Sequence, residues 1–198
     1  MIFDSIIKTE RLILRCLDFS DAEHLFRLRS DPEYAEIFGW KPYTSIKQAN
    51  DRIKRCREDN SCYVFSVLPI ISAEAVGGIC LWNINYENNT AEIGYDLEKE
   101  YRGKGYAQEA CAAILRFAFD ELKMKTVTAF PGVKNQPSVA LLKKLNFKCK
   151  GTIKSTSESG DEQYDFRLEY STDLSPSSAA RFAGQLSIQT SNRRQEAE

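Results

Sequence analysis

Short stretches of alternating hydrophobic and polar residues predict several β-strands along the chain. The expected strands cover residues 11–15, 62–68, 76–82, 91–97, 125–130, 147–153 and 164–170. Turn-forming residues at 85–89 separate two of these strands, so the middle strands are expected to form an antiparallel meander. The glycine pair Gly77–Gly78 predicts a bulge or a close approach of two backbones.

Apolar residues at spacings of three and four predict helices between the strands. Ser20 and Ser45 each precede a glutamate or glutamine by three residues, which is typical of a capping box, so helices are expected to begin there. The first helix is expected to end before Pro32. A long helix is expected over residues 107–122, and a short one begins at Pro137.

The chain has 198 residues, of which 42% are hydrophobic, and this suits one globular domain with its own core. Residues 171–198 are rich in Ser, Gln, Ala and Arg and have no strong period. We expect a polar, flexible C-terminal tail there, with a short helix near residues 179–186. Residues 1–170 are expected to form one domain of the α/β class, with a mixed sheet flanked by helices.

Charge and composition argue against several classes of function. Lys and Arg number 27 against 28 Asp and Glu, and the net charge of -1 disfavours a generic nucleic-acid binder. No apolar run reaches the roughly 20 residues of a membrane helix, and the N-terminus does not resemble a signal peptide, so a cytoplasmic protein is expected. The 6 cysteines are scattered and His24 is the single histidine, so we expect reduced thiols and no metal. A serine hydrolase would have to use His24, which lies in an expected surface helix.

The loop Arg102–Ala107 is the clearest candidate for a binding site. It follows a strand, carries two glycines and opens onto the long helix. A helix N-terminus offers unpaired N–H groups and partial positive charge, glycines let a phosphate come close, and Arg102 and Lys104 add full charge. The pattern therefore predicts a pyrophosphate cradle, although not a Walker A loop. The alternative is a basic surface turn whose glycines only cap the helix.

Asn135 and Ser138 form a second candidate, at the junction of a strand and a helix. The Asn135 amide could bond the amides of a ligand, and the Ser138 hydroxyl could donate a proton outward. The alternative is that both residues only cap the helix.

Four segments of the chain, taken in this order and at these spacings, are informative together. They are Thr9–Arg15, Ile93–Tyr95, Arg102–Ala107, and Asn135–Phe147, which includes Ser138 and Asn146. Over residues 6–170 the chain resembles the GNAT superfamily of acyl-CoA-dependent N-acetyltransferases, in its RimJ/RimL-like branch. The resemblance implies the GNAT acyl-CoA N-acyltransferase fold, a mixed twisted sheet with splayed central strands, and acetyl-CoA as cosubstrate.

The resemblance also implies where acetyl-CoA binds. Its pantetheine arm would insert like an extra strand between residues 93–97 and 127–130. Main-chain groups of Tyr95, Asp96 and Leu97 would bond the pantetheine arm, and so would Asn135. The loop Arg102–Ala107 would hold the pyrophosphate. Ser138 would lie close to the sulfur. The implied binding residues are Tyr95, Asp96, Leu97, Arg102, Gly103, Lys104, Gly105, Tyr106, Ala107, Asn135 and Ser138.

Acetyl transfer to an amine needs a neutral nucleophile and a proton donor for the departing thiolate. Glu92 is the candidate base, because its strand should border the acceptor pocket; a solvated strand-face carboxylate is the alternative. Ser138 is the candidate acid or sulfur-positioning group. Many relatives carry a tyrosine donor at the position of Leu142 and some carry a glutamate base at that of Phe130, so this chain departs from the family at both places.

The leading hypothesis is an N-acetyltransferase acting on a primary amine, either a protein N-terminal α-amine or a small-molecule amine, by direct attack in a ternary complex. The alternative is an acyl-CoA-binding sensor or scaffold with a degenerate catalytic centre. The expected partner is the amine acceptor, without nucleic acid or membrane, for a monomer or homodimer. Candidate acceptor residues are the aromatic Trp40, Tyr43, Trp82 and Tyr86 and the acidic Asp31, Glu33 and Glu36. Core aromatics and a solvated acidic face are the alternatives.

Overall fold

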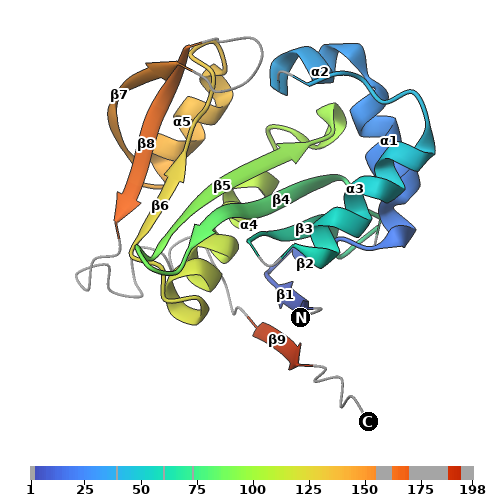
Figure 1. The fold of residues 1–198 in the computed structure, drawn as a ribbon, viewed down its shortest axis with the longest axis horizontal. Coiled ribbons are helices and arrows are strands. Elements are labelled where there is room, and N and C mark those ends of the chain that lie inside the picture. The colour runs from blue at the N-terminus through green and yellow to red at the C-terminus, as the bar shows by residue number, and fades with distance from the viewer. Residues whose placement is uncertain are drawn as a thin grey trace.

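The computed structural model describes residues 3–38, 40–59, 61–72, 74–154, 162–169 and 187–192, with backbone alone at 3, 4, 37, 38 and 187–192. Its strands form one mixed sheet in the order β7-β8-β6-β5-β4-β3-β2-β1-β9 (Figure 1). The strands are β1 (Phe3–Lys8), β2 (Leu12–Cys16), β3 (Tyr63–Pro69), β4 (Gly77–Asn85), β5 (Thr90–Leu97), β6 (Thr126–Ala129), β7 (Lys148–Lys154), β8 (Glu162–Glu169) and β9 (Ser187–Asn192). The expected α/β class with a mixed sheet is confirmed.

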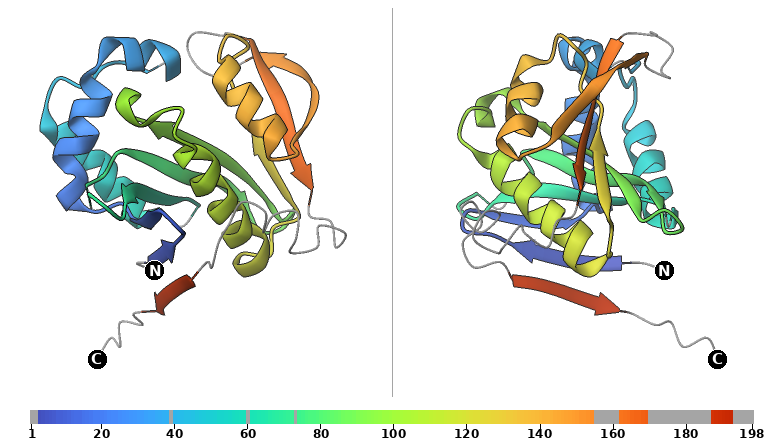
Figure 2. Two further views of the ribbon diagram at one scale, coloured as in Figure 1. Left: turned by 180° about the vertical axis from the view of Figure 1, so that it is seen from behind. Right: turned by 90° about the vertical axis from the view of Figure 1, so that its left-hand side faces the viewer.

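Helices cover both faces of the sheet. The α-helices are α1 (Ala22–Ser30), α2 (Pro32–Phe38), α3 (Ile46–Glu58), α4 (Tyr106–Arg116) and α5 (Gln136–Lys144). Helices α4 and α5 lie on one face and α1 and α3 on the other (Figure 2). The long helix was expected to reach residue 122. Its α-helical part ends at Arg116, and residues 117–121 continue it as a π-helical turn.

The main hydrophobic core lies between the sheet and helices α4 and α5. Phe65, Phe117, Phe166, Ile79 and Ile114 are fully buried in it. Burial of each such side chain contributes about 1.5–3 kcal/mol, so this layer fixes the sheet against α4. A smaller apolar cluster lies under α1 and α3 on the opposite face. The functional consequence is that α4 is held rigidly at the end of β5.

One of the two expected capping boxes is confirmed and the other is wrong. Ser45 and Gln48 form the box that begins α3, with the Ser45 N–H donating to the Gln48 side chain at 3.1 Å. The turn before α1 uses Asp18 and Asp21 instead of Ser20 and its partner three residues on. The Asp18 N–H donates to the Asp21 carboxylate at 2.9 Å, so an acidic pair takes the place of the serine box.

Three elements were not expected from the sequence pattern. Strand β1 precedes the first expected strand, and Pro32, at the expected helix end, opens the short helix α2. Within the expected tail, Ser187–Asn192 pairs with β1 as β9, in antiparallel register from Phe3–Asn192 to Lys8–Ser187. The expected short helix near 179–186 and the rest of the tail lie outside the described residues.

Candidate active site

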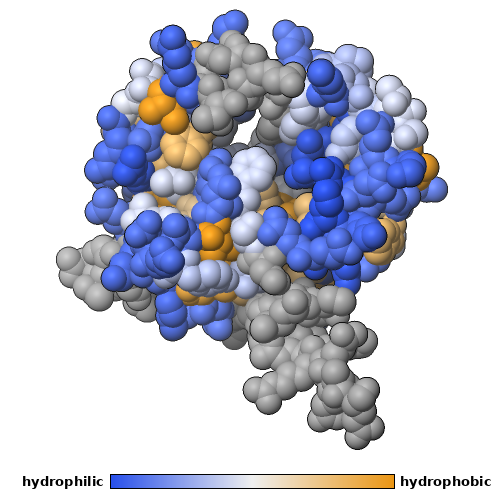
Figure 3. All heavy atoms as spheres, in the orientation of Figure 1, coloured by the Kyte–Doolittle hydropathy of each residue, from blue (hydrophilic) through white to orange (hydrophobic). Residues whose placement is uncertain are grey.

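The two central parallel strands are joined at one end and separate at the other. β5 pairs with β6 at Thr90, Ala91 and Glu92, and none of the pairs described between these strands extends beyond Glu92 and Thr128. Residues 93–97 of β5 therefore face an open gap, as expected, and Figure 3 shows the surface hollowed there. On the other strand the divergence starts later than expected, because Val127 and Thr128 are still paired.

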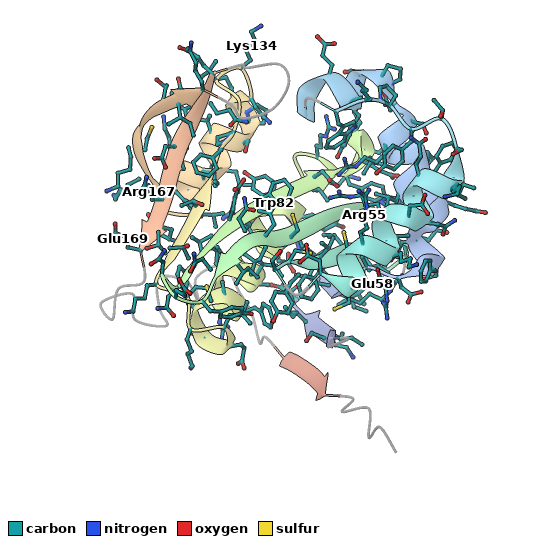
Figure 4. All side chains as sticks on the ribbon, viewed as in Figure 1. Arg55, Glu58, Trp82, Lys134, Arg167 and Glu169 are labelled. Carbon is teal, nitrogen blue, oxygen red and sulfur yellow. The ribbon has the colours of Figure 1, made fainter. Side chains whose placement is uncertain are left out.

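Where the strands part, four side chains stand in one row across the sheet. Trp82 is paired with Glu92, Glu92 with Thr128, and Thr128 with Arg167. Directly paired residues project from the same face of a sheet, so these four side chains, here called the apex row, share one face. Trp82 is 40% exposed, and Figure 4 places it beside the gap with Arg167 on β8 across from it. The predicted base is thus at the apex of the gap.

A bulge in β4 directs a hydrogen bond onto Glu92. The register of β4 shifts between Trp82 and Asn85, and Asn83 adopts the left-handed conformation with φ 48°. The Asn83 Nδ2 donates to Glu92 Oε2 at 2.9 Å. Burial raises the pKa of Glu92 above its usual value, and the hydrogen bonds from Asn83 and Trp82 oppose that rise. Glu92 is therefore a half-buried, oriented carboxylate rather than a freely solvated one.

On the other face, one hydroxyl pair crosses the gap. The Tyr95 phenol of β5 lies 2.7 Å from the Ser138 Oγ in the first turn of α5. Burial raises the pKa of Tyr95, which keeps the phenol protonated. Leu142, where relatives were expected to carry a donor, is buried and apolar. The two hydroxyls supply proton donors next to the gap that Leu142 does not.

The loop after β5 presents an unpaired row of backbone amides. Helix α4 begins after Gly105, whose φ of 83° is left-handed, and Gly103 has φ 75°. The N–H groups of residues 103–108 donate to no described residue, as expected at a helix N-terminus. Such amides, together with the helix dipole, suit a phosphate group. The geometry fits the predicted pyrophosphate cradle.

A buried carboxylate that the sequence analysis did not single out fixes this loop. Glu109 of α4 is 7% exposed and accepts hydrogen bonds from the Thr9 hydroxyl at 2.6 Å and from the Arg11 N–H at 2.8 Å. The Arg11 Nε donates to the same carboxylate at 2.7 Å, and its Nη1 donates to the Lys104 carbonyl at 3.0 Å. The sequence could have pointed to this contact, because Glu109 lies in the first turn after a glycine-containing loop and a Thr-x-Arg segment occurs near the start of the chain.

The two basic residues of the loop point in different directions. The Arg102 Nε donates to the Leu97 carbonyl at 2.9 Å, and its guanidinium lies 5.3 Å from the Tyr34 ring centroid. Lys104 is exposed, with its Nζ 5.1 Å from the ring centroid of Tyr101. Arg102 thus closes the end of β5, while Lys104 remains the exposed cation beside the amides.

Asn135 has the capping role that was the alternative for it. Its Oδ1 accepts from the Ser138 N–H at 3.2 Å, so the oxygen is engaged within the chain. Its Nδ2 donates to no described residue and stays available as a donor at the edge of the gap. The cap and the predicted binding role are therefore compatible, because they use different atoms of one amide.

Asp96 lies on the same face of β5 as Glu92, but it is enclosed. Its Oδ1 accepts from the Gly78 N–H at 2.8 Å, and burial raises the pKa of its carboxyl group against the opposing charge of Arg29. A Cβ at Gly77 would come within 2.3 Å of the Asp96 carbonyl oxygen, so the glycine pair permits the expected close approach of β4. Asp96 is a half-buried, hydrogen-bonded side chain beside the site rather than an exposed binding group.

No group of three or more His, Cys, Asp and Glu side chains among the described residues is arranged to hold a metal ion. None of the helices in the described part of the chain is both long and apolar enough to cross a membrane.

Comparison with known proteins agrees with this geometry. The acetyltransferase (GNAT) domain family matches residues 11–148. An uncharacterized N-acetyltransferase, p20, of Bacillus licheniformis is 35% identical over 150 residues, which cover 74% of this chain and 84% of that protein. The spermidine N(1)-acetyltransferase of Vibrio cholerae is 24% identical over 143 residues, covering 72% and 82%. The solved structure of spermidine N-acetyltransferase from Vibrio cholerae with CoA and spermine shares the fold, with a TM-score of 0.75 and 21% identity over 83% of this chain and 99% of that chain.

Proposed function

The chain belongs to the GNAT superfamily of acetyl-CoA-dependent acetyltransferases. We propose that it is a member of the RimJ/RimL-like branch and that it acetylates a primary amine by direct attack in a ternary complex. The acceptor is a protein N-terminal α-amine or a small-molecule amine. The observation that carries the proposal is the open gap along residues 93–97, with a row of free amides at one end and Glu92 at the other.

The spacing of these features supports the order of binding groups. Five open residues of β5 span roughly 16 Å, so an extended arm anchored at the α4 loop reaches toward the apex row. We assign the pyrophosphate to the amides and side chains of Arg102–Ala107, with Lys104 as the exposed cation. Main-chain groups of Tyr95, Asp96 and Leu97 and the free Nδ2 of Asn135 bond the arm by strand-like pairing.

The chain's residues then supply the proton transfers. Acetyl-CoA brings the activated thioester. Glu92 accepts a proton from the amine, directly or through one water, which restores the lone pair that attacks the carbonyl carbon. The C–N bond forms and the C–S bond breaks, with the electron pair leaving on sulfur. The Ser138 hydroxyl, held by Tyr95 at 2.7 Å, donates a hydrogen bond to that sulfur.

The test is release of CoA thiol from acetyl-CoA over a panel of N-terminal peptides and small amines. We expect turnover with at least one amine and intersecting lines in initial-velocity plots, as a ternary complex requires. Lys104→Glu places a negative charge beside the amides without backbone strain and is expected to raise the KM for acetyl-CoA. A substitution at Gly105 is less informative, because its φ of 83° strains any side chain.

The alternative of a sensor or scaffold makes a different prediction. A protein of that kind binds CoA, and Lys104→Glu weakens the binding, but no amine in the panel releases thiol. A ping-pong velocity pattern would instead contradict direct attack. An unchanged acetyl-CoA KM in Lys104→Glu would remove the phosphate assignment.

A further inference from the structure

A positively charged corner faces the acceptor side of the sheet. Arg29, at the end of α1, stacks on Trp40 with its guanidinium carbon 3.4 Å from the ring centroid. Its Nε is buried and has no hydrogen-bond partner among the described residues. Arg52 of α3 lies close enough to lower the pKa of Arg29 together with burial, so two cations share this corner. Arginine stays protonated in proteins, so both are charged.

One carboxylate of a described residue lies near this corner, but it is not ion-paired with either arginine. Neither Arg29 nor Arg52 forms an ion pair with a carboxylate of a described residue. Asp96 is the carboxyl group that interacts with Arg29, but its Oδ1 accepts a hydrogen bond from the Gly78 N–H, and burial raises its pKa. A half-buried guanidinium without an ion-pair partner in the described part of the chain is costly, which favours an anion supplied by a ligand.

Two of the three acidic side chains expected to favour a cationic acceptor, Asp31 and Glu33, have partners within the chain, whereas Glu36 is exposed. Asp31 accepts from the Glu33 N–H at 2.9 Å as the start of α2. Glu33 itself lies 4.0 Å from the Lys99 ammonium, and Glu98 lies between Arg27 at 2.9 Å and His24 at 3.2 Å. A polyamine would bring a second positive charge toward Arg29 and Arg52.

Resting on the proposed function, we propose that Arg29, supported by Trp40 and Arg52, binds a carboxylate of the acceptor, so that the enzyme prefers amines that carry a negative charge. A planar guanidinium matches a carboxylate with two parallel hydrogen bonds. Asp96 and Cys80 are near enough to Arg29 to raise its pKa, and Cys80 is paired with Gly94, two residues from Glu92. These positions lie roughly 7 to 13 Å along β5 from Glu92.

That separation selects among anionic amines. In a free α-amino acid the amine and the carboxylate are adjacent, which is too short for Glu92 and Arg29 together. An extended peptide advances about 3.3 Å per residue, so an acidic side chain at its third position spans the distance. The favoured acceptor is therefore a peptide N-terminus with a carboxylate about two residues away.

The experiment compares the amidated peptides Ala-Ala-Glu-Ala, Ala-Ala-Gln-Ala and Ala-Ala-Lys-Ala with spermidine in the thiol-release assay. We expect kcat/KM to be about tenfold higher for the Glu peptide than for the Gln peptide, and lowest for the Lys peptide and spermidine. Arg29→Gln should make kcat/KM equal for the Glu and Gln peptides, and should leave the KM for acetyl-CoA unchanged. Arg29→Lys keeps the charge but not the planar stack, and gives an intermediate ratio.

Arg55→Gln is the matched control, because Arg55 is an exposed arginine of the same helix as Arg52 and should leave the ratio intact (Figure 4). Equal rates for the Glu and Gln peptides, a ratio that survives Arg29→Gln, or a better rate with spermidine would overturn the proposal while leaving acetyl transfer standing. Absence of turnover with every amine counts against the proposed function instead. In that case the Glu peptide is titrated into the CoA-loaded protein and the change in tryptophan fluorescence is followed. A change that saturates with the wild type and is lost in Arg29→Gln supports the anion site. A change that does not saturate with the wild type rejects the anion site.

Discussion

At the scale of single residues, the apex of the gap shows how local strain orients a reactive group. Asparagine tolerates the left-handed conformation better than most residues, and Asn83 uses it to turn its amide onto Glu92 at 2.9 Å. Burial alone would hold Glu92 protonated over a wider pH range, and this hydrogen bond counters that effect. The bulge therefore influences the pH range over which Glu92, the proposed base, is ionised.

Asn83→Gly tests this arrangement, because glycine keeps the left-handed backbone and removes the donor. Without the donor the pKa of Glu92 rises further, so the acidic limb of kcat/KM should move to higher pH by about one unit. Asn89→Gly is the control, since Asn89 is also left-handed, with φ 54°, and the hydrogen bonds described at Glu92 do not involve it. If the acidic limb of the kcat/KM profile does not move in Asn83→Gly, the Asn83 hydrogen bond does not influence catalysis.

Glu92→Gln tests the base itself and has a second, opposite effect on stability. Activity should fall by about 10²- to 10⁴-fold at neutral pH. The folded-state pKa of Glu92 is raised, so the carboxylate costs stability as pH rises above about 4.3 and the full cost applies above the folded pKa. Thermal unfolding should therefore show the variant at least as stable as the wild type at pH 8, with the difference vanishing near pH 4. If Glu92→Gln keeps the wild-type rate, Glu92 is not the base and is only a solvated carboxylate on the strand.

At the scale of elements, the position of α4 depends on one buried contact to the start of the sheet. Glu109→Ala leaves the Thr9 hydroxyl and the Arg11 N–H and guanidinium without their acceptor. We expect the free energy of unfolding in urea to fall by about 3 kcal/mol, and the KM for acetyl-CoA to rise because the loop is no longer held. Glu121→Ala, an exposed glutamate after α4, should change neither quantity. Loss of stability alone, with an unchanged KM, would show that the loop does not need this anchor.

The elements that the sequence predicted are those whose signals are local. The Ser45–Gln48 box, the proline at the start of α5 and the glycines before α4 each act within one turn, and the structure has all three. The open gap and the GNAT fold followed from the resemblance. The partners of Glu92 and Glu109 are distant in sequence or depend on a bulge, so no periodicity shows them. Arg102 is predicted to contact the phosphate, and the bond from its Nε to the Leu97 carbonyl is a tertiary contact that residue type does not determine.

At the scale of the whole molecule, the sheet has the binding gap in its interior and strand β9 at one edge. The gap between β5 and β6 lies four strands away from β1, and β9 covers the outer edge of β1 (Figure 1). β1 pairs with β2 at Ile6, Ile7 and Lys8, whereas its six pairs with β9 include Phe3 and Asp4. The C-terminal segment therefore protects an edge that would otherwise be open to pairing with another chain.

Deletion of residues 171–198 tests that role. The exposed β1 edge should lower the thermal unfolding temperature and cause concentration-dependent self-association, measured by light scattering. The KM for acetyl-CoA should not change, because helix α4 and its loop are fixed by Glu109 and the main core rather than by β9. Deletion of residues 193–198 alone, which keeps β9, is the control and should behave as the full chain. If the longer deletion is equally stable and does not associate, the segment is the dispensable flexible tail that its composition predicted, and pairing with β1 contributes nothing to the fold.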